Sequence, residues 1–279
     1  MPALPTTNLT LHQDASDNDH LWKTYVSGGP NTGVPADGDT IEAWDDEFVS
    51  GQIMKQIGAA GLPVWRSTTP LMALPCLDFA GGQRMGLTNA SGTARVLSDI
   101  LGAAAATVFI AFYAESITGN SATVYHNDPL CCDAGAYFGI FLKDVGAGSY
   151  VIQAFNYNGG TISVEIPVTV GASHVVMMRN DGANLYIALD GGGESSVASN
   201  TTANINNQDQ LAWGDGSNGT FDGRIGERAV YNAALSGADL ANATAYFTDK
   251  WLGTGAAGLS QFTAGGLTGE RLTGGGFVS

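Results

Sequence analysis

The sequence is poor in charged side chains and poorest in basic ones. Charged residues make up 13% of the 279 positions, and 11 Lys and Arg stand against 26 Asp and Glu, which gives a formal net charge of −15. Nucleic acids and anionic membranes are bound through clusters of positive charge, and the basic residues here are scattered. We therefore expect neither as a partner, whereas an acidic surface suits oxygen-ligated cations such as calcium.

Cysteine is scarce, and long apolar runs are missing. Cys76, Cys131 and Cys132 do not form a disulfide framework, and no Cys/His spacing suggests zinc. Two interpretations stay open: buried thiols, or a bond from Cys131 or Cys132 to Cys76 or to another subunit. The longest apolar run, 100–114, is interrupted and too short to span a bilayer. The opening Met-Pro-Ala-Leu-Pro lacks the regions of a secretory leader, so none is expected.

Short β-branched and aromatic runs alternate with Gly- and Asn-rich turns over most of the chain. Turn signals recur about every 8–12 residues, a spacing typical of sandwiches and barrels. Long helices between strands are missing, which argues against a parallel βαβ sheet. The pattern predicts an all-β fold. Strands are expected at 74–79, 107–113, 137–142, 149–155, 161–170, 173–179, 184–190, 210–213 and 223–231.

A few segments favour helix instead. The apolar set within 45–58, preceded by three acidic residues, predicts a short amphipathic helix. Residues 94–101 predict a helical turn. Ser236, three residues before Asp239, resembles a capping box, and Gly253 can close the helix that follows. We expect this last helix to pack against the sandwich.

Composition divides the chain into three parts. Residues 1–69 look irregular apart from the short helix and are expected to pack on the sandwich, which covers 70–253. Residues 254–279 form a short extended, Gly-rich docking tail that cannot build its own core. The tail is either a disordered end or a strap that orders on a partner. Its candidate assembly residues are Leu259, Phe262, Leu267, Leu272 and Phe277.

Three stretches, taken in order, resemble the laminin-G-like/concanavalin A-like lectin-glucanase jelly-roll superfamily. They are 74–82 (LPCLDFAGG), the hairpin at 173–191, and 221–236 (FDGRIGERAVYNAALS). The third is similar to the closing strand of the family and the helix after it, and is the most specific. At the end of the hairpin's second strand, the spacing from Tyr186 to Asp190-Gly191 is two residues longer than in the family's pattern. The resemblance covers roughly 70–253 and implies an antiparallel jelly-roll β-sandwich with one C-terminal helix packed on it.

Glu227 is the unusual residue of the third stretch. Side chains of equal parity are expected on one face of its strand: Phe221, Ile225, Ala229 and Tyr231. Glu227 shares this inward parity. It either caps backbone amides or pairs with Arg224 or Arg228, or else it lines a site.

The carboxylate pattern of the family's hydrolases is not found. The nearest run, Glu-Ala-Trp-Asp-Asp-Glu at 42–47, has the wrong spacing and is expected to precede a helix. The four histidines are far apart, and His174 is expected to be a structural histidine within a strand. We therefore expect no enzymatic activity.

Candidate binding residues come from oxygen-rich loops. Trp213 with Asp215 and Asn218 would suit a glycan rim, because it joins an aromatic platform to polar side chains. Laminin-G-like domains often carry calcium at such a rim, and the candidate ligands are Asp209, Asp215 and Asp222. Exposed turns explain the same residues equally well. Calcium is the one cofactor considered.

The resemblance implies competing functions. Such domains occur in tailed-bacteriophage particles, so the first hypothesis is a non-enzymatic virion structural protein: a capsid decoration, fibre or adhesin. It would reside in the virion, assemble with other virion proteins and with copies of itself, and touch host cell-surface glycans. The alternative is a stand-alone carbohydrate-binding lectin or adhesin. A polysaccharide hydrolase or lyase is the second alternative.

Overall fold

The structure is a computed structural model with side chains. It describes residues 2–26, 32–48, 51–57, 61–67, 74–101, 105–117, 128–133, 138–157, 160–199, 208–212 and 221–253, with 128–133 described by backbone alone. No helix within these ranges is long and apolar enough to cross a bilayer.

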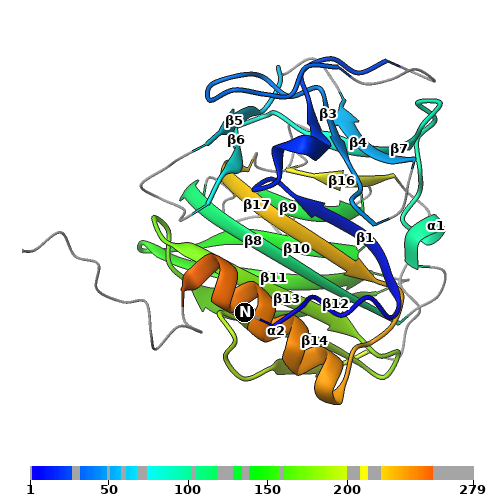
Figure 1. Cartoon of the computed structure of the whole chain (residues 1–279). Coiled ribbons are helices and arrows are strands. Elements are labelled where there is room, and N and C mark those ends of the chain that lie inside the picture. The colour runs from blue at the N-terminus through cyan, green and yellow to red at the C-terminus, as the bar shows by residue number, and fades with distance from the viewer. Residues whose placement is uncertain are drawn as a thin grey trace, which may run out of the picture.

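Two antiparallel sheets form the molecule (Figure 1). Sheet A has the order β15-β14-β13-β8-β17-β6-β5, and β1 also pairs with β17. Its strands are β1 (Leu9–Asp14), β5 (Val64–Arg66), β6 (Cys76–Ala80), β8 (Ala106–Ser116), β13 (Ser173–Asn180), β14 (Asn184–Leu189), β15 (Ser195–Ala198) and β17 (Asp222–Tyr231). One edge of β17 is shared: β6 pairs with its first half and β1 with its second half.

Sheet B has the order β12-β11-β10-β9-β16-β7-β4-β3-β2. Its strands are β2 (Leu21–Trp22), β3 (Ala43–Asp45), β4 (Gln52–Gln56), β7 (Met85–Asn89), β9 (Asp128–Asp133), β10 (Phe138–Gly146), β11 (Ser149–Tyr157), β12 (Thr161–Val168) and β16 (Asp209–Leu211). The helices are η1 (Asn18–His20), α1 (Ser98–Leu101) and α2 (Gly237–Leu252). This is the expected all-β jelly-roll sandwich with a C-terminal helix; the tail lies outside the described residues.

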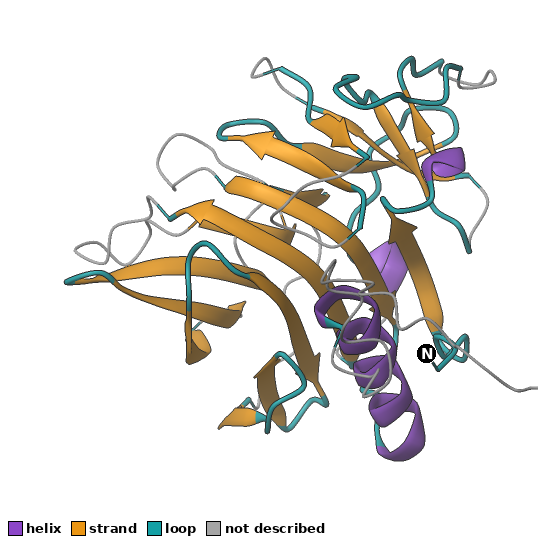
Figure 2. Cartoon of the chain, turned by 60° about the vertical axis from the view of Figure 1, so that its left-hand side comes forward, coloured by secondary structure: helices purple, strands orange, loops and turns teal. Residues whose placement is uncertain are grey.

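Two apolar cores stabilise this arrangement. The larger one lies between the sheets and takes alternate residues from both. The smaller one lies between α2 and the outer face of sheet A, which the helix covers (Figure 2). There Phe247 of α2 stacks on Phe109 of β8 with ring centroids 5.1 Å apart. The expectation that this helix packs on the sandwich is confirmed.

The expected helix at 45–58 is wrong. Strand β4 occupies its centre and pairs with β3 and β7. Both faces of β4 are covered, since the successive residues Ile53 and Met54 are buried. Strands buried on both faces lose the period-2 alternation that distinguishes them from helices in a sequence. Residues 1–69 thereby contribute strands to both sheets.

A β-bulge in β17 changes which side chains share a face. The pairing of β17 with β8 shifts between Ile225 and Glu227. Phe221 and Ile225 therefore belong to the core between the sheets, whereas Ala229 and Tyr231 belong to the core under α2. The expectation of one common face for these four residues is wrong, because an inserted residue reverses the alternation.

Of the remaining expectations about helices and cysteines, some are confirmed and others are wrong. The helical turn near residue 100 is confirmed as α1, and Gly253 closes α2 in the left-handed conformation with φ of 66°. Ser236 is the N-cap, but its side chain makes no capping hydrogen bond, so the expected capping box is wrong. Cys76 is a free, buried thiol, and burial raises its pKa to about 12. A disulfide from Cys76 is thus excluded.

Candidate functional site

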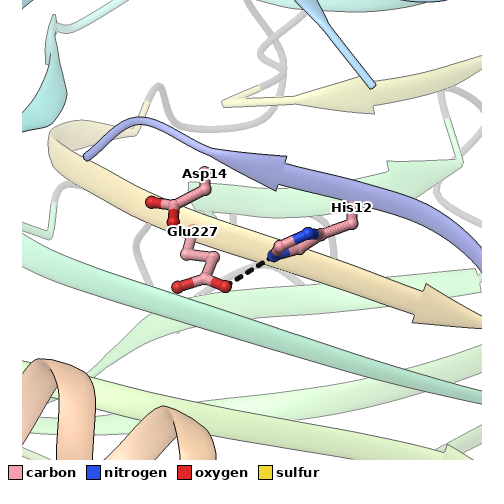
Figure 3. Close-up of side chains that lie close together, drawn as sticks. All are labelled: His12, Asp14 and Glu227. Carbon is pink, nitrogen blue, oxygen red and sulfur yellow. Dashed lines mark hydrogen bonds and ion pairs between the residues drawn. The ribbon is translucent and has the colours of Figure 1, made fainter. Parts of the chain in front are cut away.

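A group of ionisable side chains lies where β1, β17 and the end of α2 meet. His12 and Asp14 of β1 lie beside Glu227 of β17 on the outer face of sheet A (Figure 3). The register brings them together: Asp14 pairs directly with Glu227, and His12 lies two residues along the same face. We call this group, with Glu47, Tyr246, Lys250 and Trp251, the β1–α2 network.

Glu227 is the centre of the network. Its side chain is fully buried, yet both oxygens have partners. Oε1 lies 2.7 Å from Nε2 of His12. Oε2 accepts a hydrogen bond of 2.7 Å from the Trp251 indole and lies 2.8 Å from Nζ of Lys250. A buried carboxylate requires such compensation, because desolvation otherwise costs several kcal/mol.

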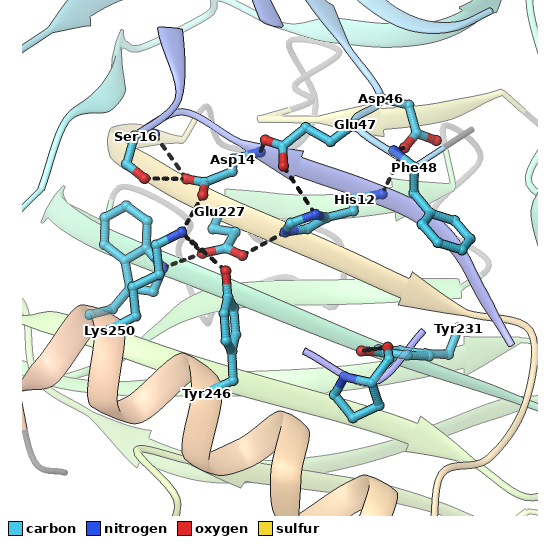
Figure 4. A network of polar contacts seen from close by, with 12 residues as sticks. His12, Asp14, Ser16, Asp46, Glu47, Phe48, Glu227, Tyr231, Tyr246 and Lys250 are labelled. Carbon is cyan, nitrogen blue, oxygen red and sulfur yellow. Dashed lines mark hydrogen bonds and ion pairs between the residues drawn. The ribbon is translucent and has the colours of Figure 1, made fainter. Parts of the chain in front are cut away.

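Asp14 and Glu47 complete the network (Figure 4). Asp14 accepts a hydrogen bond from Lys250 through Oδ2 and from the Ser16 hydroxyl through Oδ1 at 2.6 Å. Glu47 lies beyond β3, 3.2 Å from Nδ1 of His12, and also accepts from the backbone amide of Asp14 at 3.0 Å. The network therefore connects β1, the turn that follows it, the segment after β3 and helix α2 to strand β17.

The neighbours shift the protonation of each group. Burial raises the pKa of Glu47 to about 7. Burial alone would raise the pKa of Glu227, but hydrogen bonds and charges of His12 and Lys250 outweigh it and lower that pKa. Burial likewise would lower the pKa of His12, but Glu227, followed by Glu47 and Asp14, raises it. Lys250 follows the same pattern, with Glu227 and Asp14 raising its pKa.

The β1–α2 network could be a metal site, but the ammonium group of Lys250 competes with a metal ion for its carboxylates. Within the described ranges, one group of side chains could share an ion: His12, Asp14 and Glu227, whose ligand atoms all lie within 4.8 Å of one another. However, the Lys250 ammonium already binds both Asp14 and Glu227. It neutralises the carboxylates that a divalent ion would need, so the donor set fits the lysine better than a metal.

The burial of Glu227 argues against acid/base catalysis by the β1–α2 network. Carboxylates with opposite pKa shifts, such as Glu47 and Glu227, are typical of glycosidase pairs. Here Glu227 is fully buried and bonded to the Trp251 indole. A polysaccharide would have to displace α2 to reach it. The geometry is that of a structural clamp.

The clamp was missed in the sequence, and its expected partners were wrong. Glu227 pairs with neither Arg224 nor Arg228. Arg228 instead points between the sheets, where its guanidinium donates to both oxygens of the fully buried Asp209 at 2.7 and 2.8 Å. The bulge at Gly226 separates these directions. More than 200 residues lie between His12 and Glu227, so no local pattern signals their contact.

The expected site residues lie in different places. Trp213, Asp215 and Asn218 lie outside the described residues, as do all five candidate tail residues, so their roles stay predictions. Asp209 is in strand β16 and engaged by Arg228, so it does not belong to an open calcium rim. Asp222 begins β17 and accepts a hydrogen bond of 2.8 Å from Ser116.

The expectations for His174 and for the acidic run at 42–47 can also be compared with the structure. His174 is a structural histidine, as expected: Nδ1 lies 2.8 Å from Asp190, and Nε2 lies 3.0 Å from Thr169. The acidic run at 42–47 does not precede a helix; β3 occupies its centre.

Aromatic and polar side chains also share the outer face of sheet B. Phe138, Ile140 and Leu142 face the core, so Phe141 and its neighbours of that parity face outward. Phe141 is buried there and meets the half-buried Phe155 edge to face, with ring centroids 5.7 Å apart. One strand further, Glu165 accepts hydrogen bonds from Gln153 at 2.6 Å and from Lys143 at 2.7 Å. We call Phe141, Lys143, Gln153, Phe155 and Glu165 the sheet B patch.

Comparisons with known proteins agree with this architecture. A family model described as the concanavalin A-like lectin/glucanases superfamily matches residues 88–241, which is more than half of the chain. No curated protein sequence matches.

Several solved structures share the fold. Domain 4 of a GH43 extracellular arabinanase from Geobacillus stearothermophilus, in complex with arabinotriose, has a TM-score of 0.56 at 13% identity, covering 85% of this chain and 98% of that one. A botulinum neurotoxin DC binding domain has a TM-score of 0.51 at 8% identity, covering 86% and 51%. A Trypanosoma rangeli sialidase in complex with sialic acid has 0.50 at 11% identity, covering 87% and 33%. At these identities the likeness concerns the fold alone.

Proposed function

The chain belongs to the concanavalin A-like lectin/glucanase superfamily, and we propose that it is a non-enzymatic carbohydrate-binding protein. The sheet B patch carries this proposal. Its accessible part combines the half-buried ring of Phe155 with a carboxylate and an ammonium group, Glu165 and Lys143, which are 34% and 22% exposed, while Phe141 and Gln153 support them from buried positions. Sugars are bound by such mixtures of apolar surface and oriented polar groups.

Two observations support binding rather than hydrolysis. The two carboxylates whose pKa values shift in opposite directions, Glu47 and Glu227, belong to the β1–α2 network, where the burial of Glu227 keeps a polysaccharide from reaching it. The arabinanase domain that is similar to 85% of this chain is in complex with arabinotriose. The proposal carries that chemistry over as a class, an oligosaccharide, without fixing the sugar.

A glycan array probed with the full chain tests this function. We expect binding to at least one oligosaccharide class. Glu165→Gln and Phe155→Ala should each weaken it about tenfold, or about 1.4 kcal/mol. Phe48→Ala is the matched control, because Phe48 is a 47% exposed aromatic side chain outside the sheet B patch. Repeating the array with a chelator tests the predicted role of calcium.

Two results would contradict the proposal. The first is an array without any bound glycan. The second is equal binding by wild type and both patch variants, which would place the glycan elsewhere. Thermal unfolding of each variant shows whether a loss of binding comes from a loss of the fold.

A virion structural role is the second candidate. The low charged fraction of 13% favours it, because a protein packed among copies of itself exposes less of its surface to water. In this role the chain would reside in the virion, contact other virion proteins and reach host glycans. Light scattering of the full chain tests self-assembly: a mass well above 28.7 kDa supports it, and a mass of one chain contradicts it.

A further inference from the structure

A groove of about 490 Å³ lies on the outer face of sheet A, beside α2. Its floor is apolar and comes from β8, β13 and β14: Phe109, Val175, Met177 and Ala188. One wall is the stripe of α2 formed by Leu240, Ala241, Thr244, Ala245 and Thr248. The β1–α2 network lies under the other end of the same helix.

The two carboxylates on the rim of the groove both have hydrogen-bond partners. Asp190 and Glu194 also line the groove. Asp190 is bonded to His174 at 2.8 Å, and Glu194 forms a double hydrogen bond with Arg179 at 2.6 and 2.9 Å. A ligand that bound these carboxylates would have to compete with those partners. The groove therefore fits an apolar segment of low charge.

The chain itself supplies such a segment. We propose that residues 254–279 fold back and dock in the groove of their own chain. The 26 residues after Gly253 include only two charged side chains, Glu270 and Arg271, and their apolar residues are spaced a few positions apart among glycines. This proposal is independent of the proposed function.

The distances suit docking within one chain. Leu240 lies 13 residues before Gly253, which is about 20 Å along a helix that rises about 1.5 Å per residue. Leu259 follows Gly253 by six residues, and an extended chain spans about 20 Å over that length. A segment running back along α2 thus brings Leu259 level with Leu240. Phe262 follows as a second apolar anchor.

Covalent linkage makes modest contacts sufficient. A tethered segment has an effective concentration in the millimolar range for a short flexible linker. Two apolar anchors entering the groove then hold the segment for most of the time. A separate partner of the same composition would lack this advantage and would need additional contacts.

Hydrogen–deuterium exchange of the full chain tests the docking. In the wild type, peptides covering 259–267 should exchange at least about tenfold more slowly than peptides at the extreme C-terminus. Ala241→Trp fills the groove and should abolish this protection. Ala238→Trp is the matched control, since Ala238 is exposed on the same helix but does not line the groove. In Ala238→Trp, peptides covering 259–267 should be as protected from exchange as in the wild type.

A second variant keeps the test decisive if Ala241→Trp perturbs the fold. Leu259→Asp combined with Phe262→Asp alters only the segment and should also abolish the protection. Rapid exchange of 259–267 in the wild type overturns the proposal, and so does protection that survives either variant. Protection that grows with protein concentration also overturns it, because the segment then occupies the groove of another copy.

Discussion

Replacing Glu227 by Gln tests the β1–α2 network most directly. The substitution keeps the shape of the side chain and removes its charge. His12 and Lys250 then lose the carboxylate that lies 2.7 and 2.8 Å from them, while the indole of Trp251 can still donate to the new amide oxygen. Breaking a buried ion pair from one side costs about 3–5 kcal/mol. Asp14 still compensates Lys250, so we expect the lower end, about 3 kcal/mol.

Thermal unfolding measures this loss. For a chain of this size each kcal/mol lowers the midpoint by about 2–4 °C, so Glu227→Gln should unfold about 6–12 °C below the wild type. Glu165→Gln is the control: it also removes a carboxylate bonded to a lysine, but that pair is partly exposed. Exposed pairs contribute about 0–1 kcal/mol. A midpoint for Glu227→Gln within about 2 °C of the wild type would refute the clamp.

The difference between Glu227→Gln and wild type should depend on pH with a definite sign. The native state lowers the pKa of Glu227 below its unfolded value of 4.5. The stabilisation is therefore fully present above the unfolded pKa and is lost as the pH falls through the folded pKa. The two unfolding curves should accordingly converge in acid. Curves that stay equally far apart at low pH would show that the loss comes from packing and not from charge.

Four further results are expected. Because the folded state raises the pKa of Glu47 from 4.5 to about 7, it holds more protons than the unfolded state between these values. The wild type should lose stability as the pH rises through that window, and Glu47→Gln should lose less. Gly226→Ala should cost about 1–3 kcal/mol in denaturant unfolding, since a Cβ there would lie 2.3 Å from the Trp251 ring. Asp209→Asn should cost about 3–5 kcal/mol by leaving the buried Arg228 without its counter-charge. Added zinc should not shift the thermal midpoint by more than about 2 °C, because the Lys250 ammonium already neutralises the carboxylates of the β1–α2 network.

Most strands that follow residue 70 could be predicted because their signals are local, although β7, β9 and β15 were missed. In the hairpin of β13 and β14, a β-branched and apolar run reaches Asn-Asp-Gly and then resumes, so strand, turn and strand are all marked in neighbouring residues. Helix α2 is marked in the same way by Ser236 before it and Gly253 after it. Such features need no knowledge of distant contacts.

Features that depend on pairing could not be predicted. Strand β4 carries a helix-like apolar pattern, and only its place between β3 and β7 makes it a strand. The bulge at Gly226 has no signal beyond the glycine itself. Its consequence is large, because one inserted residue sends Arg228 between the sheets to Asp209 and leaves Glu227 under α2.

The β1–α2 network also lies largely outside the part of the chain that the family explains. The family match covers 88–241, which includes Glu227 but none of His12, Asp14, Glu47 and Lys250. A carboxylate buried on the outer face of a sheet is costly by itself. It is tolerated here because β1 brings an imidazole and α2 brings an ammonium group to it. The burial of Glu227 therefore requires both ends of the folded region, so the family segment alone should not fold stably without them.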